Sequence, residues 1–333
     1  MKEHHIPLTA GEIAALWTGY MSDEMSHCVL RHFAATVEDA QIRSVVEYAL
    51  SLTEEHLAFK RELFDRERFP TPRGFGDGDV NLEAPRLFSD KFILFYLRQM
   101  GITGLSAYGV ACGCSPRADV RAFYSHNVHT TLELLNRSTD LLLEKGIFVR
   151  APQFPFPETP EFVENAGWLS GWFGDRRPLN AVEVTHLWLN TLTNALGRSL
   201  MLGFAQVASS ADIRKYFIRG MEISRKHIDV FSSRLEQDQL PPPMTYDVEV
   251  TTSKEPPFSE KLMLFHTISL CGVGLANYGA AIGSSPRRDL AMDYARLASE
   301  VGTYADDGAE LMIARGWMEK IPGVPEREAL VNS

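Results

Sequence analysis

Apolar residues recur at three- and four-residue steps along most of the chain, which is the spacing of a helix with one buried face. The first such segment carries Ile13, Leu16 and Trp17. A second segment follows Thr36 and stops at the prolines after Phe69, because proline cannot continue a helix. The pattern predicts an all-α protein built from long helices.

Capping residues mark the ends of these helices, and they occur twice at matching places. Serine is a favoured N-cap, proline is favoured in the first helical turn, and glycine often follows the last turn. The paired signals are Ser89 and Ser259, Ser115-Pro116 and Ser285-Pro286, and Gly146 and Gly316. Each half of the chain is therefore predicted to hold four helices.

The correspondence between the halves extends to individual residues at a nearly constant offset. Matching pairs are Pro7 and Pro178, Trp17 and Trp188, His56 and His227, Tyr108 and Tyr278, and Tyr124 and Tyr294. An offset that changes by one residue over the whole repeat indicates a duplicated domain. We expect a first half at residues 1–150, a linker at 151–176 and a second half at 177–333.

The connection between the second and third helices of each half is long, about twenty residues. It runs from Phe69 to Phe88 and from Leu240 to Phe258. A crossover of this length allows the second and third helices to run parallel, as in ferritin-like four-helix bundles. Polar and apolar residues alternate at 79–82 and 247–250, which predicts short extended pieces.

The third helix of each half is unusually apolar. Residues 92–114 carry Arg98 as their only charge, and residues 262–283 carry none. Each segment could cross a bilayer by length. The segments contain polar residues such as Gln99 and His266 and lack strongly basic flanks, so we expect buried central helices instead. We also predict that the two halves pack on each other through these helices, with their glycines allowing close approach.

Charge and cysteine usage narrow the function. The net charge of −10 argues against a nucleic-acid partner, which requires clustered Lys and Arg. The four cysteines, Cys28, Cys112, Cys114 and Cys271, lack metal-site spacing and do not recur between the halves. We therefore expect a reducing, cytoplasmic setting, and the N-terminus lacks the apolar core of a signal peptide.

A tandem pair of bundles, each with a glycine-rich apolar third helix ending in Ser-Pro-Arg-x-Asp, resembles a ferritin-like family of spore-forming bacteria. That family is the domain of unknown function 3231, whose members include proteins labelled as spore coat proteins. The resemblance spans nearly the whole chain and implies spore association, with coat proteins as partners. Its motifs are caps and glycines, so it implies no reaction and no cofactor.

The di-metal pattern of ferritin-like proteins, with Glu-x-x-His on two helices, is incomplete here. Glu24 and His27 have this spacing, whereas His56 follows Thr53. A divalent-metal site with an incomplete ligand set in the first half is the alternative that these residues suggest. Its candidate ligands are Glu24, His27, Glu47, His129 and Glu133. The competing interpretation is a solvated, salt-bridged patch, and no cofactor is then expected.

A second set of polar residues is kept in both halves. Its members are Trp17, His56, Tyr108, Tyr124, Trp188, His227, Tyr278 and Tyr294. Counting from the helix ends places them near one level of each half. They form either a small pocket or a hydrogen-bonded cluster that fixes helix register. We predict that His56 and His227 are buried and bond Tyr108 and Tyr278.

Two functions are compatible with these patterns. The first is a non-enzymatic structural or interaction protein, spore-associated, that forms homo-oligomers or binds coat proteins and no membrane. The second is a ferritin-like protein that binds a divalent metal or a small ligand, with weak oxidoreductase chemistry in the first half.

Overall fold

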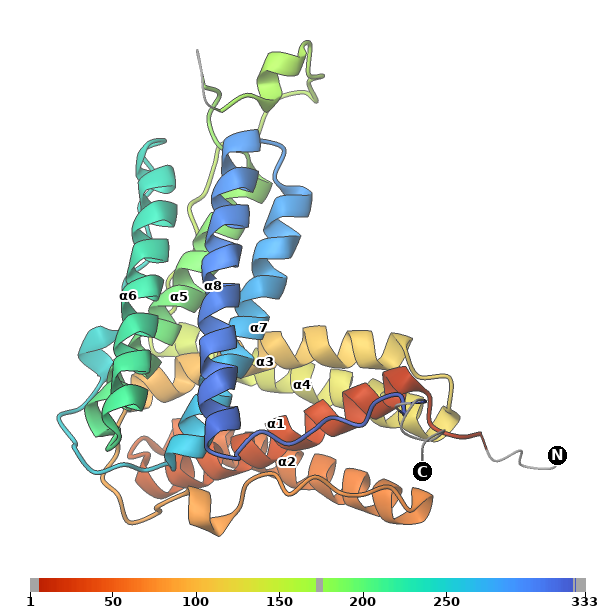
Figure 1. Cartoon of the computed structure of the whole chain (residues 1–333). Helices are drawn as coiled ribbons and strands as arrows, with labels where there is room; N and C mark the ends of the chain where they lie inside the picture. The colour runs from red at the N-terminus through yellow and green to blue at the C-terminus, as the bar shows by residue number, and fades with distance from the viewer. Residues whose placement is uncertain (1–5, 172–175, 326, 328–333) are drawn as a thin grey trace.

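The computed structural model describes residues 6–171, 176–325 and 327, and this part of the chain contains eight α-helices and no β-strand (Figure 1). The helices are α1 (Ala10–Thr36), α2 (Ala40–Glu67), α3 (Asp90–Gly113), α4 (Ala118–Glu144), α5 (Ala181–Val207), α6 (Ala211–Glu236), α7 (Glu260–Ser284) and α8 (Arg288–Ala314). The all-α prediction is confirmed. Both Gly146 and Gly316 have φ of +66°, which favours glycine after a helix.

Parts of three predicted segments lie outside the described residues: the N-terminal stretch 1–5, residues 172–175 of the linker, and the end of the chain at 326 and 328–333. The described part of the linker is largely exposed and contains one short 3-10 turn, Ala166–Leu169.

Within each half, α1 packs with α2 and α3 with α4, and the same pairs recur as α5 with α6 and α7 with α8. Helices α2 and α3 run parallel. Near their N-terminal ends, the Asp90 carboxylate accepts the Asp39 N–H at 2.7 Å, and further along His56 meets Tyr108. The long crossover therefore has the predicted effect, since it returns the chain to the same end of the half.

Residues of the repeated sequence motifs connect one helix to another by hydrogen bonds. The buried Glu12 carboxylate forms a capping box with Thr9 and also accepts the Arg117 N–H at 3.0 Å. In the second half, Glu183 does the same for Asn180 and for Arg287, again at 3.0 Å. One carboxylate thus ties the start of the first helix to the start of the fourth. A buried charge requires such donors, which explains why both copies keep it.

The two halves meet at one end and diverge from it. In Figure 1, α5–α8 stand across the direction of α1–α4, and the molecule is L-shaped. At the corner, each crossover caps the third helix of the other half. The Ser89 N–H donates to the Glu249 carbonyl at 2.8 Å, and the Ser259 N–H donates to the Asp79 carbonyl at 3.0 Å. Both serine hydroxyls also bond the carboxylates of these acidic residues at 2.6 Å.

The predicted extended pieces at 79–82 and 247–250 are wrong, because each begins in a 3-10 turn, Asp77–Asp79 and Asp247–Glu249. Extended pairing is limited to two isolated bridges between the halves, Val80 with Phe258 and Phe88 with Val250.

The third helices touch at equivalent positions. The Tyr96 hydroxyl lies 3.1 Å from His266 Nε2, and both side chains are buried. These two residues correspond in the repeat, so their contact marks a pseudo-twofold axis. The prediction that the two halves pack on each other is confirmed.

The expectation that the third helices are buried along their length is wrong. Burial is continuous only in their first halves; in their second halves isolated residues such as Ala111 and Tyr278 are buried, while Val110 near the end of α3 is 69% exposed. Of the helices that the structure describes, α7 alone has the length and mean hydropathy of a membrane span, and 39% of that window is buried. The cause is the divergence of the two halves beyond Tyr96 and His266.

The glycines have a different role from the one predicted. Gly101 and Gly104 face Leu135 and Thr131 of α4, not the other half. A Cβ added at the later glycines of both helices would meet nothing within 4 Å. These glycines are Gly109, Gly113, Gly272, Gly274, Gly279 and Gly283.

Burial lowers the pKa of His266 from 6.5 to about 4. As the pH falls between these values, the unfolded chain takes up the proton before the folded chain does. The contribution of this residue to the free energy of unfolding therefore falls by at most about 1.4 kcal/mol per pH unit. We expect the free energy of unfolding of His266→Phe, measured by urea titration, to fall less steeply with decreasing pH than that of the wild type. His129→Gln, at an exposed position, is the control, and equal slopes for all three proteins would contradict the account.

Candidate functional site

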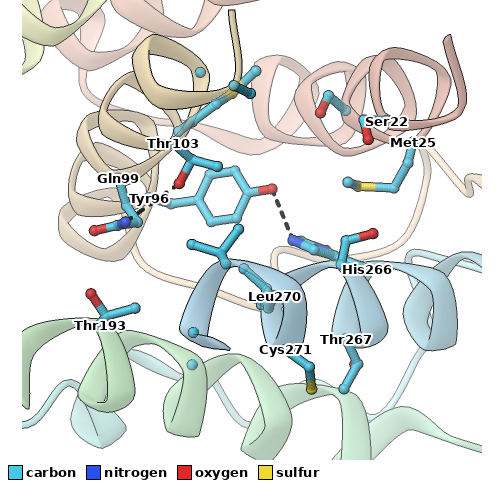
Figure 2. A pocket seen from close by; sticks show the side chains of 18 of the residues that line it. Ser22, Met25, Tyr96, Gln99, Thr103, Thr193, His266, Thr267, Leu270 and Cys271 are labelled. Carbon is cyan, nitrogen blue, oxygen red and sulfur yellow. Dashed lines mark hydrogen bonds between the residues drawn. The ribbon is translucent and has the colours of Figure 1, made fainter. Parts of the chain in front are cut away.

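A cavity of about 440 Å³ extends through the corner between the two halves and receives side chains from all eight helices. Figure 2 shows its centre, where Tyr96 of α3 bonds His266 of α7. Its walls are mostly apolar, with Leu200, Leu270 and Met100 among them. The cavity exists because the helices that meet at the corner separate on either side of it.

The cavity opens in the cleft between α1 and α3 on one side and α5 and α7 on the other. Thr18 and Ala107 line it and are exposed. Ser22, Gln99 and Thr193 around the same region are partly exposed (Figure 2). A small organic molecule could therefore reach the interior past short, uncharged side chains.

The end of the cavity in the first half is polar and largely buried, with Tyr108 partly exposed. The Lys60 ammonium lies 2.5 Å from the Asp23 carboxylate, which also lies 3.5 Å from His56 Nδ1. The Tyr108 hydroxyl is 3.3 Å from the same nitrogen. Burial by itself would raise the pKa of Asp23, but the Lys60 charge and the His56 contact outweigh it and lower this pKa. The pair is therefore ionised and internally neutralised.

Three polar atoms on residues of the cavity wall have no hydrogen-bond partner among the described residues: His56 Nε2, the Tyr124 hydroxyl and His266 Nδ1. All three side chains are almost completely buried. Burial raises the pKa of Tyr124, so its hydroxyl stays protonated. A buried polar group without a partner costs about 1–3 kcal/mol. These atoms have almost no accessible surface, so they are buried behind the cavity wall and do not face the cavity.

The amide of Asn127, one turn further along α4, also has no partner among the described residues, but it is not part of the wall.

At the corresponding end in the second half, His227, Tyr278 and Asn194 are linked by hydrogen bonds. His227 Nδ1 lies 2.8 Å from the Tyr278 hydroxyl, and its Nε2 lies 3.1 Å from the Glu300 carboxylate. Asn194 stands at the position that corresponds to Asp23, and its side-chain amide donates to the Tyr278 hydroxyl at 2.9 Å. Phe231 occupies the position of Lys60. Burial lowers the pKa of His227 although Glu300 opposes this shift, so its imidazole is neutral.

The structure confirms that His56 and His227 are buried and contact Tyr108 and Tyr278. Tyr124 and Tyr294 join them, with ring centroids 6.2 Å from Tyr108 and 5.8 Å from Tyr278.

The two tryptophans do not lie at this level. Trp17 packs edge-on against Phe69 near the end of α2. It is about 9 Å along α1 from Asp23, at 1.5 Å per residue. Trp188 lines a smaller, separate pocket of about 180 Å³ with Phe95 and Phe148. Residue counting placed the tryptophans wrongly because it ignored how far the helices are staggered.

The structure does not bring the candidate metal ligands together. Glu24 accepts a hydrogen bond from Arg61 at 2.6 Å, and His27 lies 3.7 Å from Glu54. The other three candidates are exposed side chains: Glu47, His129 and Glu133. Across the described ranges, no group of three or more His, Cys, Asp or Glu side chains is placed to hold a metal ion. The helices orient these residues toward different neighbours.

The sequence analysis missed Asp23 and Lys60. Asp23 directly precedes Glu24, which the metal hypothesis favoured. Lys60 follows His56 by four residues and therefore lies on the same helix face, among apolar positions. A charged residue within an apolar stripe was the available signal. The loss of both charges in the second half would then have marked the pair as specific to the first.

We expect Lys60→Phe alone to lower the free energy of unfolding by about 3–5 kcal/mol, because it leaves the Asp23 charge buried without a partner. The double variant Asp23→Asn, Lys60→Phe copies the second half and should recover most of this loss. Denaturant titration of the three proteins tests the prediction. A double variant no more stable than the single one would show that the charge pair is not coupled.

Comparisons with known proteins complete the description of the site. A search of curated proteins finds no match. One similar solved structure is a crystal structure of a "putative spore coat protein" from Bacillus halodurans C-125, with 21% sequence identity and a TM-score of 0.40. The match covers 45% of this chain and 98% of that one. A family model described as "Protein of unknown function (DUF3231)" matches residues 1–159 and again residues 168–330. The chain therefore belongs to the DUF3231 family and matches its model twice in tandem.

Proposed function

We propose that this protein is a non-enzymatic binding protein that holds a small, largely apolar organic molecule in the cavity between its halves. The observation that carries the proposal is the cavity itself, about 440 Å³ with mostly apolar walls. This size falls within the range of small-molecule sites, roughly 300–1,000 Å³. Such sites typically combine apolar walls with a few polar groups, as Ser22, Gln99 and Thr193 provide here.

The side chains around the cavity favour binding over catalysis. The Asp23 carboxylate is committed to Lys60. Cys271 lines the cavity, but burial raises the pKa of its thiol to about 12, so it is a poor nucleophile. The histidines of the second half and of the corner have neutral, buried rings that bond tyrosines.

The ferritin-like organisation of each half as a four-helix bundle is part of this proposal. The long crossovers and the parallel α2 and α3 support it. In such bundles, buried carboxylates commonly face metal cations. Here the Lys60 ammonium supplies the positive charge beside Asp23. Spore association, homo-oligomers and coat-protein partners, which the family resemblance implies, stay predictions.

We expect 1-decanol to raise the free energy of unfolding of the full chain with the logarithm of its concentration above Kd, by about 2.7 kcal/mol at a hundred times Kd, and so to raise the unfolding midpoint. Thr103→Phe fills part of the cavity and should reduce this gain. Ser106→Phe adds the same ring on the exposed side of the same helix and is the matched control. No stabilisation of the wild type, or equal gains for both variants, would count against the proposal.

We expect the alternative, a bound divalent metal, to fail a direct test. Protein purified without a histidine tag should carry only substoichiometric metal by elemental analysis. Glu24→Ala, His27→Ala should leave that content unchanged, because Glu24 pairs with Arg61. Stoichiometric metal that disappears in the double variant would favour the metal-binding function instead.

A further inference from the structure

Arg98 is the only charged residue in the apolar stretch 92–114, and the proposed function does not use it. Its side chain is partly buried and lines the smaller pocket of about 180 Å³. Within the described part of the chain, its guanidinium has no hydrogen-bond partner and no carboxylate at ion-pair distance. A partly buried arginine is normally paired, because an unpaired charge away from water is costly. An anionic ligand would supply the missing partner.

The rest of the pocket wall is mainly apolar, with aromatic rings from four separate segments. These are Phe95 of α3, Phe148 just after α4, Trp188 of α5, and Tyr246 in the crossover after α6. The guanidinium carbon of Arg98 lies 5.1 Å from the centre of the Phe148 ring, and the centres of the Phe95 and Tyr246 rings are 4.7 Å apart. A guanidinium can stack on a ring with its face and still donate hydrogen bonds in its own plane.

Two groups of this wall keep donor atoms accessible. The Nε atom of Arg98 is buried, but its two terminal Nη atoms keep accessible surface, and so does the Tyr246 hydroxyl. Burial raises the pKa of Tyr246 to about 12 although the Arg98 charge opposes this shift, so the hydroxyl is protonated and can donate. The acidic group that acts on Tyr246 is Glu249, which is paired with Lys91 at 3.0 Å.

The size and charge of the pocket narrow the ligand. Ala151 and Leu189 line the pocket and are exposed, so it is open to solvent. A cavity of roughly 150 Å³ accommodates one benzene ring, so this pocket has room for a single ring with a small substituent. Arg98 is the only charged residue of the wall and compensates one negative charge. A phosphate dianion would keep an uncompensated charge among apolar side chains, whereas a carboxylate matches the guanidinium through two parallel hydrogen bonds.

We infer that this pocket binds a small aromatic carboxylate of the size of benzoate. The carboxylate accepts hydrogen bonds from the Arg98 guanidinium, and the ring lies among the aromatic side chains of the wall. The site is separate from the large cavity, with which it shares only Gln99 and Leu196. The repeat does not duplicate it, because Ile268 occupies the position of Arg98 in the second half.

Four probes separate the charge from the ring: benzoate, benzamide, acetate and inorganic phosphate. Benzamide keeps the ring without the charge, and acetate keeps the charge without the ring. Titration calorimetry of the full chain should show benzoate binding about tenfold or more tighter than any of the others, because a hydrogen bond to a charged group is worth at least roughly a factor of ten.

Variants then assign the preference to Arg98. Arg98→Ile copies the second half and should weaken benzoate binding about tenfold or more, with little effect on benzamide. Arg137→Ile is the matched control, because Arg137 also stacks on a ring, that of Tyr48 at 4.0 Å, but is paired with Glu133 at 2.8 Å. It should leave benzoate binding unchanged. If Arg98→Ile does not fold, as judged by circular dichroism, Arg98→Lys replaces it, and it should bind benzoate more weakly than the wild type because it lacks the planar fork.

Saturating 1-decanol tests the location, since it should leave benzoate bound. Displacement of benzoate by 1-decanol would place it in the large cavity and overturn the assignment. Benzamide or phosphate binding as tightly as benzoate, or equal effects of the Arg98 and Arg137 variants, would overturn it too. None of these results bears on the proposed function, which depends on whether 1-decanol itself binds.

Discussion

The reciprocal capping of the third helices is the constraint on which the rest of the structure depends. Ser89 and Ser259 each begin a third helix and bond the crossover of the opposite half. The exchange fixes both helix N-termini at one corner and brings Tyr96 and His266 together on the pseudo-twofold axis. Because the helices start together but point in different directions, they must separate beyond this contact. The cavity and its opening follow from that separation.

The duplication separates structural residues from candidate functional ones. Glu12 and Glu183 link the starts of the first and fourth helices in the same way in their two halves, so the fold explains why both copies keep them. The capping serines are also kept in both halves. The buried charge pair of Asp23 and Lys60 exists only in the first half. Its counterparts, Asn194 and Phe231, are uncharged, and both nitrogens of His227 are bonded, one of them to the Glu300 carboxylate.

Local signals in the sequence predicted the helices well. Proline after Phe69 and glycine at 146 and 316 end helices for backbone reasons that need no tertiary information. The pairing of His56 with Tyr108 was predictable because both copies keep the two residues on inner faces.

What depends on long-range geometry was not predictable from the sequence. A capping serine does not reveal that its side chain also bonds the other half of the chain, as Ser89 does with Glu249. Small apolar residues such as Ala107 suit a packed interface and a cavity rim equally well, so the exposed part of α3 was missed. The level of Trp17 depends on the stagger between helices, which composition does not contain. Glu24 and His27 share a helix but have separate partners, which their spacing alone does not reveal.

A crystal structure of the full chain grown with 1-decanol tests the central claim most directly. The account predicts one alcohol in the cavity between the halves, its chain lying past Tyr96 toward α7. An alcohol bound only on the outer surface, or a cavity filled by rearranged side chains with no room for a ligand, would contradict it.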